Sequence, residues 1–206
     1  YPDFSVIGSS PETLIKTQNN EIILRPIAGT RRRGRNTEED EKLVKELKND
    51  TKEQAEHMML VDLGRNDVGR VAEAGTVKVT QLMEVEKFSH VMHLVSEVRG
   101  KRKKNSSLFD IFKAAFPAGT LTGAPKIRAM EIIADLEKAP RGIYGGAVGY
   151  FDLSGDMDFA IAIRTMVYKS GAVTLRAGAG IVYDSIPESE DKECHNKAAA
   201  PLTVLT

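Results

Sequence analysis

The sequence predicts an α+β protein built on a largely antiparallel sheet. Two observations predict this class. Strand-like and helix-like segments come in blocks along the chain instead of alternating strictly. In addition, 41% of the 206 residues are hydrophobic, which is enough to build a sizeable core. The length fits one domain or two small ones, and with no linker in view we treat residues 1–206 as one domain.

The chain is expected to open with two strands. Apolar and polar residues alternate at 3–8 and 21–27, and a turn at Asn19–Asn20 joins these segments. Pro26 ends the second strand because proline cannot donate to a strand ladder. A basic loop bracketed by glycines is expected at 29–35.

Two helices are expected next. Thr37, with Asp40 three residues later, is a predicted N-cap for a charged helix that runs to about Lys48. A second helix begins near Asp50 and reaches about Leu63, since apolar residues recur there at helical spacing. Its expected apolar stripe is formed by Ala55, Met59 and Leu63.

The second half of the chain repeats this block pattern. The stretch 75–99 alternates well enough for two or three strands. Helices are expected at 107–115 and 125–137, around a turn rich in glycine and threonine at 117–123. Three strands and a closing helix follow. The strands are expected at 143–152, 157–168 and 172–183, and the helix starts near Pro187 and carries Lys197.

Composition excludes several classes of function. Lys+Arg and Asp+Glu both count 29, which argues against a nucleic-acid binder or a polybasic membrane protein. The basic run 99–105 lacks interleaved aromatic residues, so we interpret it as a solvated loop. No apolar run approaches the roughly 20 residues that span a bilayer. We therefore expect neither a nucleic-acid partner nor a membrane.

The single cysteine, Cys194, rules out a disulfide framework, a cysteine-rich zinc site and an iron–sulfur cluster. It fits a reducing compartment, so we expect the cytoplasm, or a plastid if the source is a plant. The chain begins at Tyr1 instead of Met, and we expect it to be a portion of a longer chain.

Carboxylates gather on two of the predicted helices. Glu53, Glu56 and His57 fall on adjacent faces of one helical turn. The last helix carries a second acidic group, formed by Glu188, Glu190, Asp191 and Glu193. Two helices that each offer carboxylates suit a Mg²⁺ ion that keeps waters and also takes a ligand oxygen. The alternative is that both groups are solvated helix faces.

Arg164 interrupts the apolar strand 159–167, and a buried arginine needs an anionic partner, which a ligand carboxylate would supply. The glycine-rich runs 145–149 and 178–180 would let a ligand approach the backbone, or would serve a bulge or close strand packing. His90 and His93 would face opposite sides of a strand, so at most one is expected in a given site. Together these features indicate an anionic small-molecule site with Mg²⁺.

Nine segments, in order along the chain, resemble the chorismate-utilising enzymes. They are GSSPE (8–12), PIAGTRRRG (26–34), KEQAEHMMLVDLGRNDVGR (52–70), SHVMHLVS (89–96), PAGTLTGAPKIRAMEII (117–133), RGIYGGAVGY (141–150), IAIRT (161–165), AGAGIVYDSIPESE (177–190) and NKA (196–198). Within the family the chain is most similar to the large subunit, component I, of anthranilate synthase. The resemblance implies a C-terminal catalytic portion with antiparallel sheets and helices packed outside.

The resemblance also implies a site, residue by residue. The Mg²⁺ ligands fall on Glu56 and Glu193, supported by Glu53 and Glu190. The contacts to chorismate fall on Gly29, Thr30, Tyr144, Arg164, Gly178, Ala179, Gly180 and Lys197. The catalytic residues fall on Glu12, His93 and Thr120. Glu12 matches the general acid for departure of the C4 hydroxyl.

The implied reaction adds ammonia to C2 of chorismate with loss of the C4 hydroxyl, and then eliminates pyruvate to give anthranilate. Ammonia would come from a glutamine amidotransferase subunit, component II, in a hetero-oligomer. Aminodeoxychorismate synthases commonly carry a nucleophilic lysine where this chain has Ala28, which favours direct attack by ammonia. The alternatives are an aminodeoxychorismate synthase, an isochorismate or salicylate synthase that adds water, and an inactive ligand-binding fragment.

Overall fold

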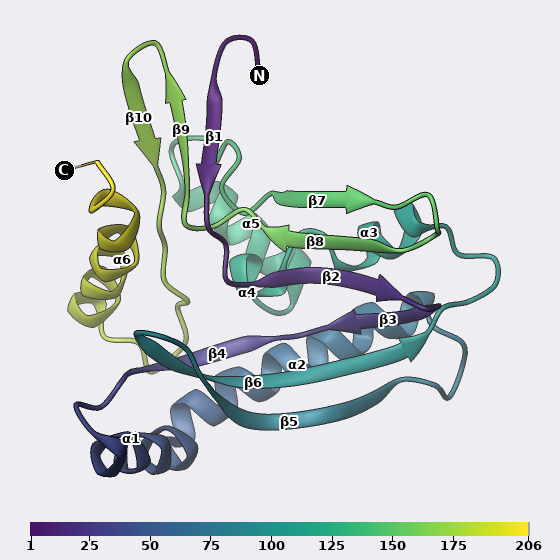
Figure 1. Ribbon diagram of the computed structural model, residues 1–206, viewed down its shortest axis with the longest axis horizontal. Helices are drawn as coiled ribbons and strands as arrows, with labels where there is room; N and C mark the ends of the chain where they lie inside the picture. The colour runs from purple at the N-terminus through teal and green to yellow at the C-terminus, as the bar shows by residue number, and fades with distance from the viewer. Residues whose placement is uncertain (206) are drawn as a thin grey trace.

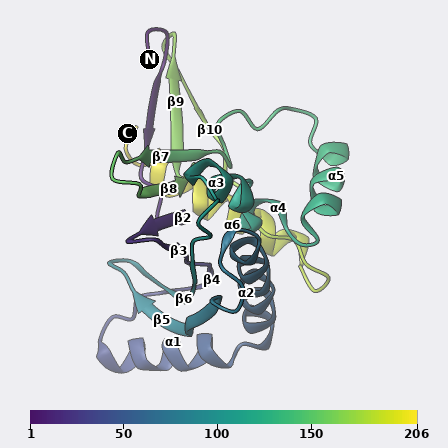
Figure 2. The ribbon, with the colours of Figure 1, turned by 90° about the vertical axis from the view of Figure 1, so that its right-hand side faces the viewer.

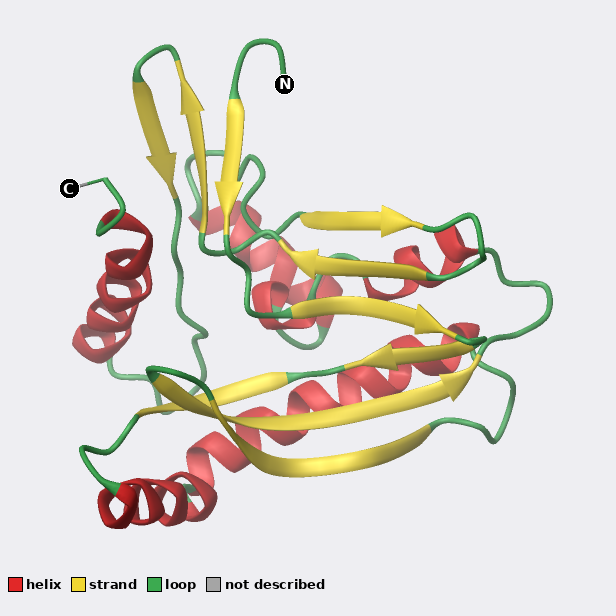
Figure 3. Cartoon of the chain, in the orientation of Figure 1, coloured by secondary structure: helices red, strands yellow, loops and turns green. Residues whose placement is uncertain are grey.

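The computed structural model describes residues 1–205 and contains two antiparallel sheets with helices against them (Figure 1 and Figure 3). The strands are β1 (Ser5–Gly8), β2 (Thr13–Gln18), β3 (Glu21–Leu24), β4 (Ile27–Arg32), β5 (Lys78–Lys87), β6 (Val91–Lys101), β7 (Ala147–Phe151), β8 (Met157–Ile161), β9 (Thr165–Lys169) and β10 (Ala172–Leu175). The helices are α1 (Thr37–Asn49), α2 (Thr51–Val71), α3 (Leu108–Ala115), α4 (Gly119–Thr122), α5 (Lys126–Leu136) and α6 (Pro187–Leu202). The predicted class is confirmed. No helix in the described chain is long and apolar enough to cross a membrane.

The larger sheet has the strand order β4-β6-β3-β2-β8-β7, and β5 pairs with β6. One side of β6 pairs with β5 along its length, and the other side pairs with β3 and then with β4. The β2–β3 hairpin turns at Asn19 and Asn20, which both adopt positive φ angles, as asparagine does more readily than most residues. The predicted Asn19–Asn20 turn is therefore confirmed, but it joins β2 to β3, whereas the predicted strand 3–8 lies in the other sheet as β1.

The smaller sheet has the order β1-β9-β10 and stands away from the larger one in Figure 1. The chain passes between the two sheets twice, from β1 to β2 and from β8 to β9. These crossings lie side by side, because the Ser9 amide donates to the Arg164 carbonyl (3.2 Å) and the Ile161 amide donates to the Glu12 carbonyl (3.0 Å). The topology thus brings Glu12 and Arg164 to one corner.

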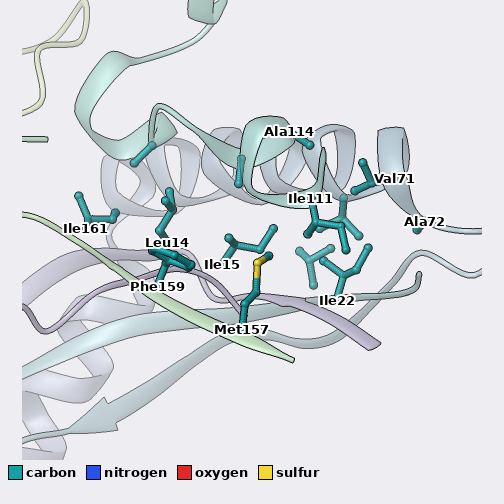
Figure 4. Packing of buried hydrophobic residues seen from close by; sticks show 14 of the residues in the cluster. Leu14, Ile15, Ile22, Val71, Ala72, Ile111, Ala114, Met157, Phe159 and Ile161 are labelled. Atoms are coloured by element: carbon teal, nitrogen blue, oxygen red, sulfur yellow. The ribbon is translucent and has the colours of Figure 1, made fainter. Parts of the chain in front are cut away.

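The main core lies between the larger sheet and helices α2 and α3 (Figure 4). Apolar side chains from β2, β3 and β8 meet those from the two helices there. Fully buried examples are Ile15, Ile22, Ile111, Met157 and Ile161. Burying apolar surface in this way is the dominant favourable contribution to folding.

The Ile15→Ala substitution is expected to lower the free energy of unfolding by about 2–5 kcal/mol, because it leaves a cavity in this core. Leu153→Ala is the matched control, since Leu153 is fully exposed, and it should change stability by less than about 0.5 kcal/mol. Urea-induced unfolding of both variants measures the difference. An equal effect of the two substitutions would contradict the packing described here.

Several predicted strands need correction. The strand β2 was not predicted, because Lys16 and Thr17 disguise its pattern; Thr17 is buried, and its hydroxyl accepts the Met157 amide (2.9 Å). The predicted basic loop at 29–35 begins within β4. The predicted solvated loop at 99–105 begins within β6, where ion pairs with carboxylates on neighbouring segments hold Arg99 and Lys101.

The remaining strand corrections arise at breaks in the backbone. The stretch 75–99 forms two strands, and β5 stays continuous through a bulge at Met83, which has a positive φ. The predicted strand 157–168 is divided between the two sheets. The predicted strand 172–183 ends at Leu175, and the glycine-containing loop follows it.

The predicted helices are confirmed with two corrections, and the predicted turn at 117–123 additionally contains the short helix α4. The N-cap of α1 is Asn36, not Thr37, and the Asn36 side chain accepts the Glu39 amide (2.9 Å). Helix α2 continues past Leu63 to Val71, and its predicted stripe is wrong because Ala55 is exposed. Its buried residues are His57, Leu60, Val61, Gly64, Asp67, Val68 and Val71. Three of these are not large apolar residues, so apolar spacing alone misplaced the buried face.

Candidate active site

Arg164 lies at the corner where the chain leaves the larger sheet, not within one continuous strand as predicted. It adopts a positive φ of 49°, a strained conformation that in proteins clusters at functional sites. Its half-buried guanidinium has no hydrogen bond or ion pair with any described residue. A cation placed in this way is available to an anionic ligand.

Glu12 occupies the same corner as an unusual carboxyl group. Burial raises its pKa to about 7, and the Thr120 hydroxyl, Arg164 and Lys197 oppose this rise. The Thr120 hydroxyl oxygen is buried and has no hydrogen bond of normal geometry within residues 1–205. Near neutral pH Glu12 is therefore partly protonated, and it can donate a proton to a ligand.

His93, on β6, points its Nδ1 atom at the β4 backbone. Nδ1 lies 3.0 Å from the Gly29 carbonyl oxygen and 3.1 Å from the Thr30 hydroxyl oxygen. Because a carbonyl only accepts, Nδ1 carries the proton and Nε2 keeps its lone pair. Burial lowers the pKa of His93, and Arg164 and Lys197 add to this effect. His93 is thus a neutral imidazole with a free acceptor, whereas His90 is exposed in the β5–β6 turn.

The loop 178–180 approaches the site through its backbone. The Lys197 ammonium donates to the Gly178 carbonyl (3.3 Å). A Cβ atom at Gly178 would lie 2.9 Å from the Tyr144 hydroxyl oxygen, and one at Gly180 would lie 3.1 Å from Glu56 Oε1. The glycines on either side of Ala179 therefore give the Tyr144 and Glu56 side chains room, while the approach of a ligand to this backbone stays a prediction. The run 145–149 serves strand packing instead at Gly149, where a Cβ would overlap β8.

The two acidic helix segments come together in the structure. Glu56 on α2 is half-buried, and its pKa is raised by burial first and then by the negative charges of Glu53 and Glu193. Glu193 comes from α6, so the two predicted carboxylate groups share one electrostatic environment. Glu193 itself is exposed, as the alternative interpretation of a solvated helix face expects, so a Mg²⁺ site at this pair stays a prediction.

Two lysines form ion pairs with carboxylates of this acidic cluster. Lys197 forms an ion pair with Glu193, and Lys52 lies 3.6 Å from the buried Glu190. Within residues 1–205 no group of three or more His, Cys, Asp or Glu side chains is placed to hold a metal ion. Mg²⁺ needs no closed protein cage, because it keeps waters and uses one or two carboxylates with ligand oxygens. Glu56 and Glu193 fit that open donor set.

One predicted neighbour lies outside the site. His57 is fully buried, its Nε2 lies 2.7 Å from the Ser96 hydroxyl oxygen, and burial lowers its pKa to about 4. Sequence reasoning also missed Arg31, whose guanidinium donates to Asp50 (2.8 Å) and Glu53 (3.3 Å). Arg31 thereby fixes the start of α2 to β4. The sequence signal that could have revealed this pairing is the basic segment around Arg31, together with the acidic residues at the start of α2.

Most of the predicted site residues gather around Arg164 and Lys197. These two cations act on both Glu12 and His93; Arg164 also acts on Tyr144, and Lys197 on Glu56. The arrangement offers carboxylate-binding cations, a proton donor, a proton acceptor and a pair of carboxylates for a cation. Such a site suits an anionic small molecule.

A family model for chorismate binding enzymes matches residues 1–203. The chain belongs to the chorismate-binding enzyme family. Its curated relatives include the proteins named anthranilate synthase component 1 from Acetivibrio thermocellus and from Aquifex aeolicus. The first is 55% identical over 205 residues and the second 56% over 208 residues. The chain aligns over its full length but spans only 42% of the length of each of these relatives.

Solved structures of the chorismate-binding family agree with this fold. Anthranilate synthase component I from Streptococcus pneumoniae matches 98% of this chain and 44% of its own, with a TM-score of 0.90 and 50% identity. The menaquinone-specific isochorismate synthase from Escherichia coli matches 99% of this chain and 46% of its own, with a TM-score of 0.89 and 28% identity. The fold is therefore shared by members of the family that differ in name.

Proposed function

We propose that the chain carries the catalytic site of an anthranilate synthase large subunit. The reaction converts chorismate and ammonia into anthranilate, pyruvate and water. Ammonia forms a bond to C2, the C4 hydroxyl leaves as water with a donated proton, and the enolpyruvyl group leaves as pyruvate. The identity of 55–56% to proteins named anthranilate synthase component 1, across the whole chain, carries the proposal.

The residue at position 28 supports this choice within the family. Ala28 lies in β4, directly before the Gly29 and Thr30 residues that contact His93. An alanine side chain cannot attack C2 as a lysine amine would. Free ammonia is then the nucleophile, and the nitrogen enters without a covalent intermediate on this chain.

The substrate carboxylates are bound by the cations of the site. Arg164 and the Tyr144 hydroxyl bind the enolpyruvyl carboxylate, and the amides of loop 178–180, which lies against Tyr144, contact the substrate together with Lys197. Glu56 and Glu193 would hold Mg²⁺, with Glu53 and Glu190 beside them. When bound, the ion neutralises the ring carboxylate of chorismate and orients it.

Glu12 and His93 carry out the proton transfers, because one is a proton donor near neutral pH and the other is a proton acceptor. Glu12, with a pKa of about 7, donates a proton to the departing C4 hydroxyl. Nε2 of His93 keeps a free lone pair, because Nδ1 donates to the Gly29 carbonyl, and it accepts the proton released as the ring becomes aromatic. Thr120 lies beside Glu12 and directs its carboxyl group.

Ammonia is supplied by a partner, a glutamine amidotransferase subunit, in a hetero-oligomer. The numbered component in the names of the relatives supports a partner of this kind. The free Cys194 supports a reducing compartment, the cytoplasm.

Arg164→Met is expected to weaken chorismate binding by about 10- to 100-fold, because a charge-assisted bond to a substrate carboxylate is lost. Arg65→Met is the matched control, since Arg65 is exposed and forms an ion pair with Asp62. Calorimetric titration with chorismate measures both variants. Equal affinity in Arg164→Met and Arg65→Met would remove Arg164 from the substrate site.

Chromatography of the products tests the function directly. The chain is incubated with chorismate, Mg²⁺ and an ammonium salt, and the products are compared with standards. Anthranilate supports the proposal, whereas aminodeoxychorismate, isochorismate or salicylate would each replace it with another family activity. Unchanged chorismate, together with Mg²⁺-dependent binding in the calorimeter, would identify a binding-competent chain without turnover and overturn the proposal.

A further inference from the structure

A single ammonium group joins both ends of segment 116–125 to helix α2. Lys126, the first residue of α5, donates to Asp67 Oδ2 (3.1 Å) on α2. The same ammonium lies 3.5 Å from the carbonyl oxygen of Ala115, the last residue of α3. The residue before the segment, Ala115, and the residue after it, Lys126, are therefore held together by the Lys126 ammonium. We call this ammonium and its partner Asp67 the clamp.

The pair of charges is shielded from water. The side chains of Lys126 and Asp67 are only 17% and 6% exposed. Burial raises the pKa of Asp67, and Lys126 opposes this rise. Burying an ion pair is costly and adds little net stability, so such pairs are better explained by the arrangement that they impose.

Helix α5 has few other attachments. None of its residues is fully buried in the described structure, and Figure 2 shows it standing at one side of the molecule. Lys126 is thus its main polar link to the body of the protein. A loss of this link would free the end of segment 116–125 that precedes α5.

The clamped segment carries Thr120 to Glu12. Helix α4 lies within the segment, and Gly119 packs so closely on Leu63 of α2 that a Cβ atom would overlap it. Glu12, Thr120, Asp67 and Ala115 line one and the same cavity. Asp67 of the clamp and the proposed acid Glu12 therefore line the same cavity.

We propose that Asp67 and Lys126 form a positioning pair that holds Thr120 against Glu12 for the proton transfer. This inference rests on the proposed function. Other charged groups also face Glu12 and must be held constant in any test: Arg164 at the β8–β9 corner, Lys197 on α6, and Arg25 across the cavity. None of these three contacts the clamp through a hydrogen bond in the described chain.

Lys126→Met removes the charge and keeps the length of the side chain. It should lower kcat by roughly 10- to 100-fold, as small displacements of catalytic groups do, with KM for chorismate changed by less than about 3-fold. Arg128→Met is the control on the same helix, because the ion pair of Arg128 with Glu131 is exposed and lies within α5. A wild-type kcat in Lys126→Met would overturn the inference.

The double variant Asp67→Leu/Lys126→Met separates positioning from stability. Replacing both charges by apolar groups should leave thermal stability close to wild type. If the pair only supports the fold, kcat returns with stability, and the inference fails. If the pair positions Thr120, kcat stays low, and Thr120→Val combined with Lys126→Met is no worse than Thr120→Val alone.

Hydrogen exchange of the backbone amides 119–122 gives a readout that does not depend on turnover. Their protection should fall at least about 10-fold in the double variant and stay unchanged in Arg128→Met. Unchanged protection in the double variant would overturn the clamp itself. A wild-type chain that makes no anthranilate, but whose variants show this loss of protection, would instead contradict the proposed function alone.

Discussion

Glu56→Gln and Glu193→Gln are each expected to lower the rate of anthranilate formation more than about 100-fold. Changing residues that hydrogen-bond to metal ligands already lowers metal affinity or activity by about 10- to 100-fold, and loss of a ligand itself has a larger effect. Both variants should also need far more Mg²⁺ for half-maximal rate. Anthranilate fluorescence, recorded over a series of Mg²⁺ concentrations, measures both effects.

The chain offers a matched control for each substitution. Glu188→Gln lies on α6 and Asp62→Asn on α2; both residues are exposed, and neither is among the charged groups that act on Glu56. These controls should keep the wild-type dependence on Mg²⁺. If Glu56→Gln and Glu193→Gln also kept that dependence, Mg²⁺ would have to bind elsewhere or play no part.

Glu12→Gln is expected to lower kcat by about 100- to 10,000-fold, because the amide cannot donate the proton that the leaving hydroxyl needs. KM for chorismate should change little, because the substrate carboxylates are bound by cations such as Arg164 and not by Glu12. Glu38→Gln is the control, because Glu38 is exposed on α1. Initial rates measured over a series of chorismate concentrations separate kcat from KM.

The pH dependence follows from the same group. Burial raises the pKa of Glu12 from 4.5 to about 7, so the acid form persists to neutral pH. The wild-type kcat should therefore fall as pH rises through about 7. A residual kcat in Glu12→Gln that fell along the same curve would assign the titration to another residue.

The raised pKa also has a consequence for stability. The folded chain binds the Glu12 proton more tightly than the unfolded chain does, so the contribution of Glu12 to stability falls as pH rises from 4.5 to about 7. Glu12→Gln lacks this proton, and it should gain stability relative to wild type over that interval. Thermal unfolding of both proteins across this pH range measures the difference.

The sequence predicted residue types and their grouping better than it predicted geometry. The carboxylates of α2 and α6 could be recognised as a pair because both sets recur at helical spacing. The corner that brings Glu12 and Arg164 together could not be predicted, because the segment 157–168 alternates as one strand although it crosses between sheets. Only the pairing of β1 with β9 reveals that break.

Burial of polar groups explains most of the other differences between the predicted and the observed structure. His57 and Asp67 face inward on α2, and each finds a partner far along the chain, Ser96 and Lys126. A hydrophobic pattern treats such residues as solvent-facing, so it shortened α2 and rotated its buried face. The contacts of Lys126 could not be predicted for the same reason, since Lys126 and its two partners, Asp67 and Ala115, lie on three separate helices.

The most direct test of the account follows the nitrogen atom. The chain is mixed with chorismate, Mg²⁺ and isotopically labelled ammonium, and the anthranilate formed is examined by mass spectrometry. We predict that labelled anthranilate accumulates, that omission of Mg²⁺ or ammonium abolishes it, and that no adduct forms on the protein. A covalent adduct of chorismate with the protein, or consumption of chorismate without labelled anthranilate, would contradict direct amination at this site.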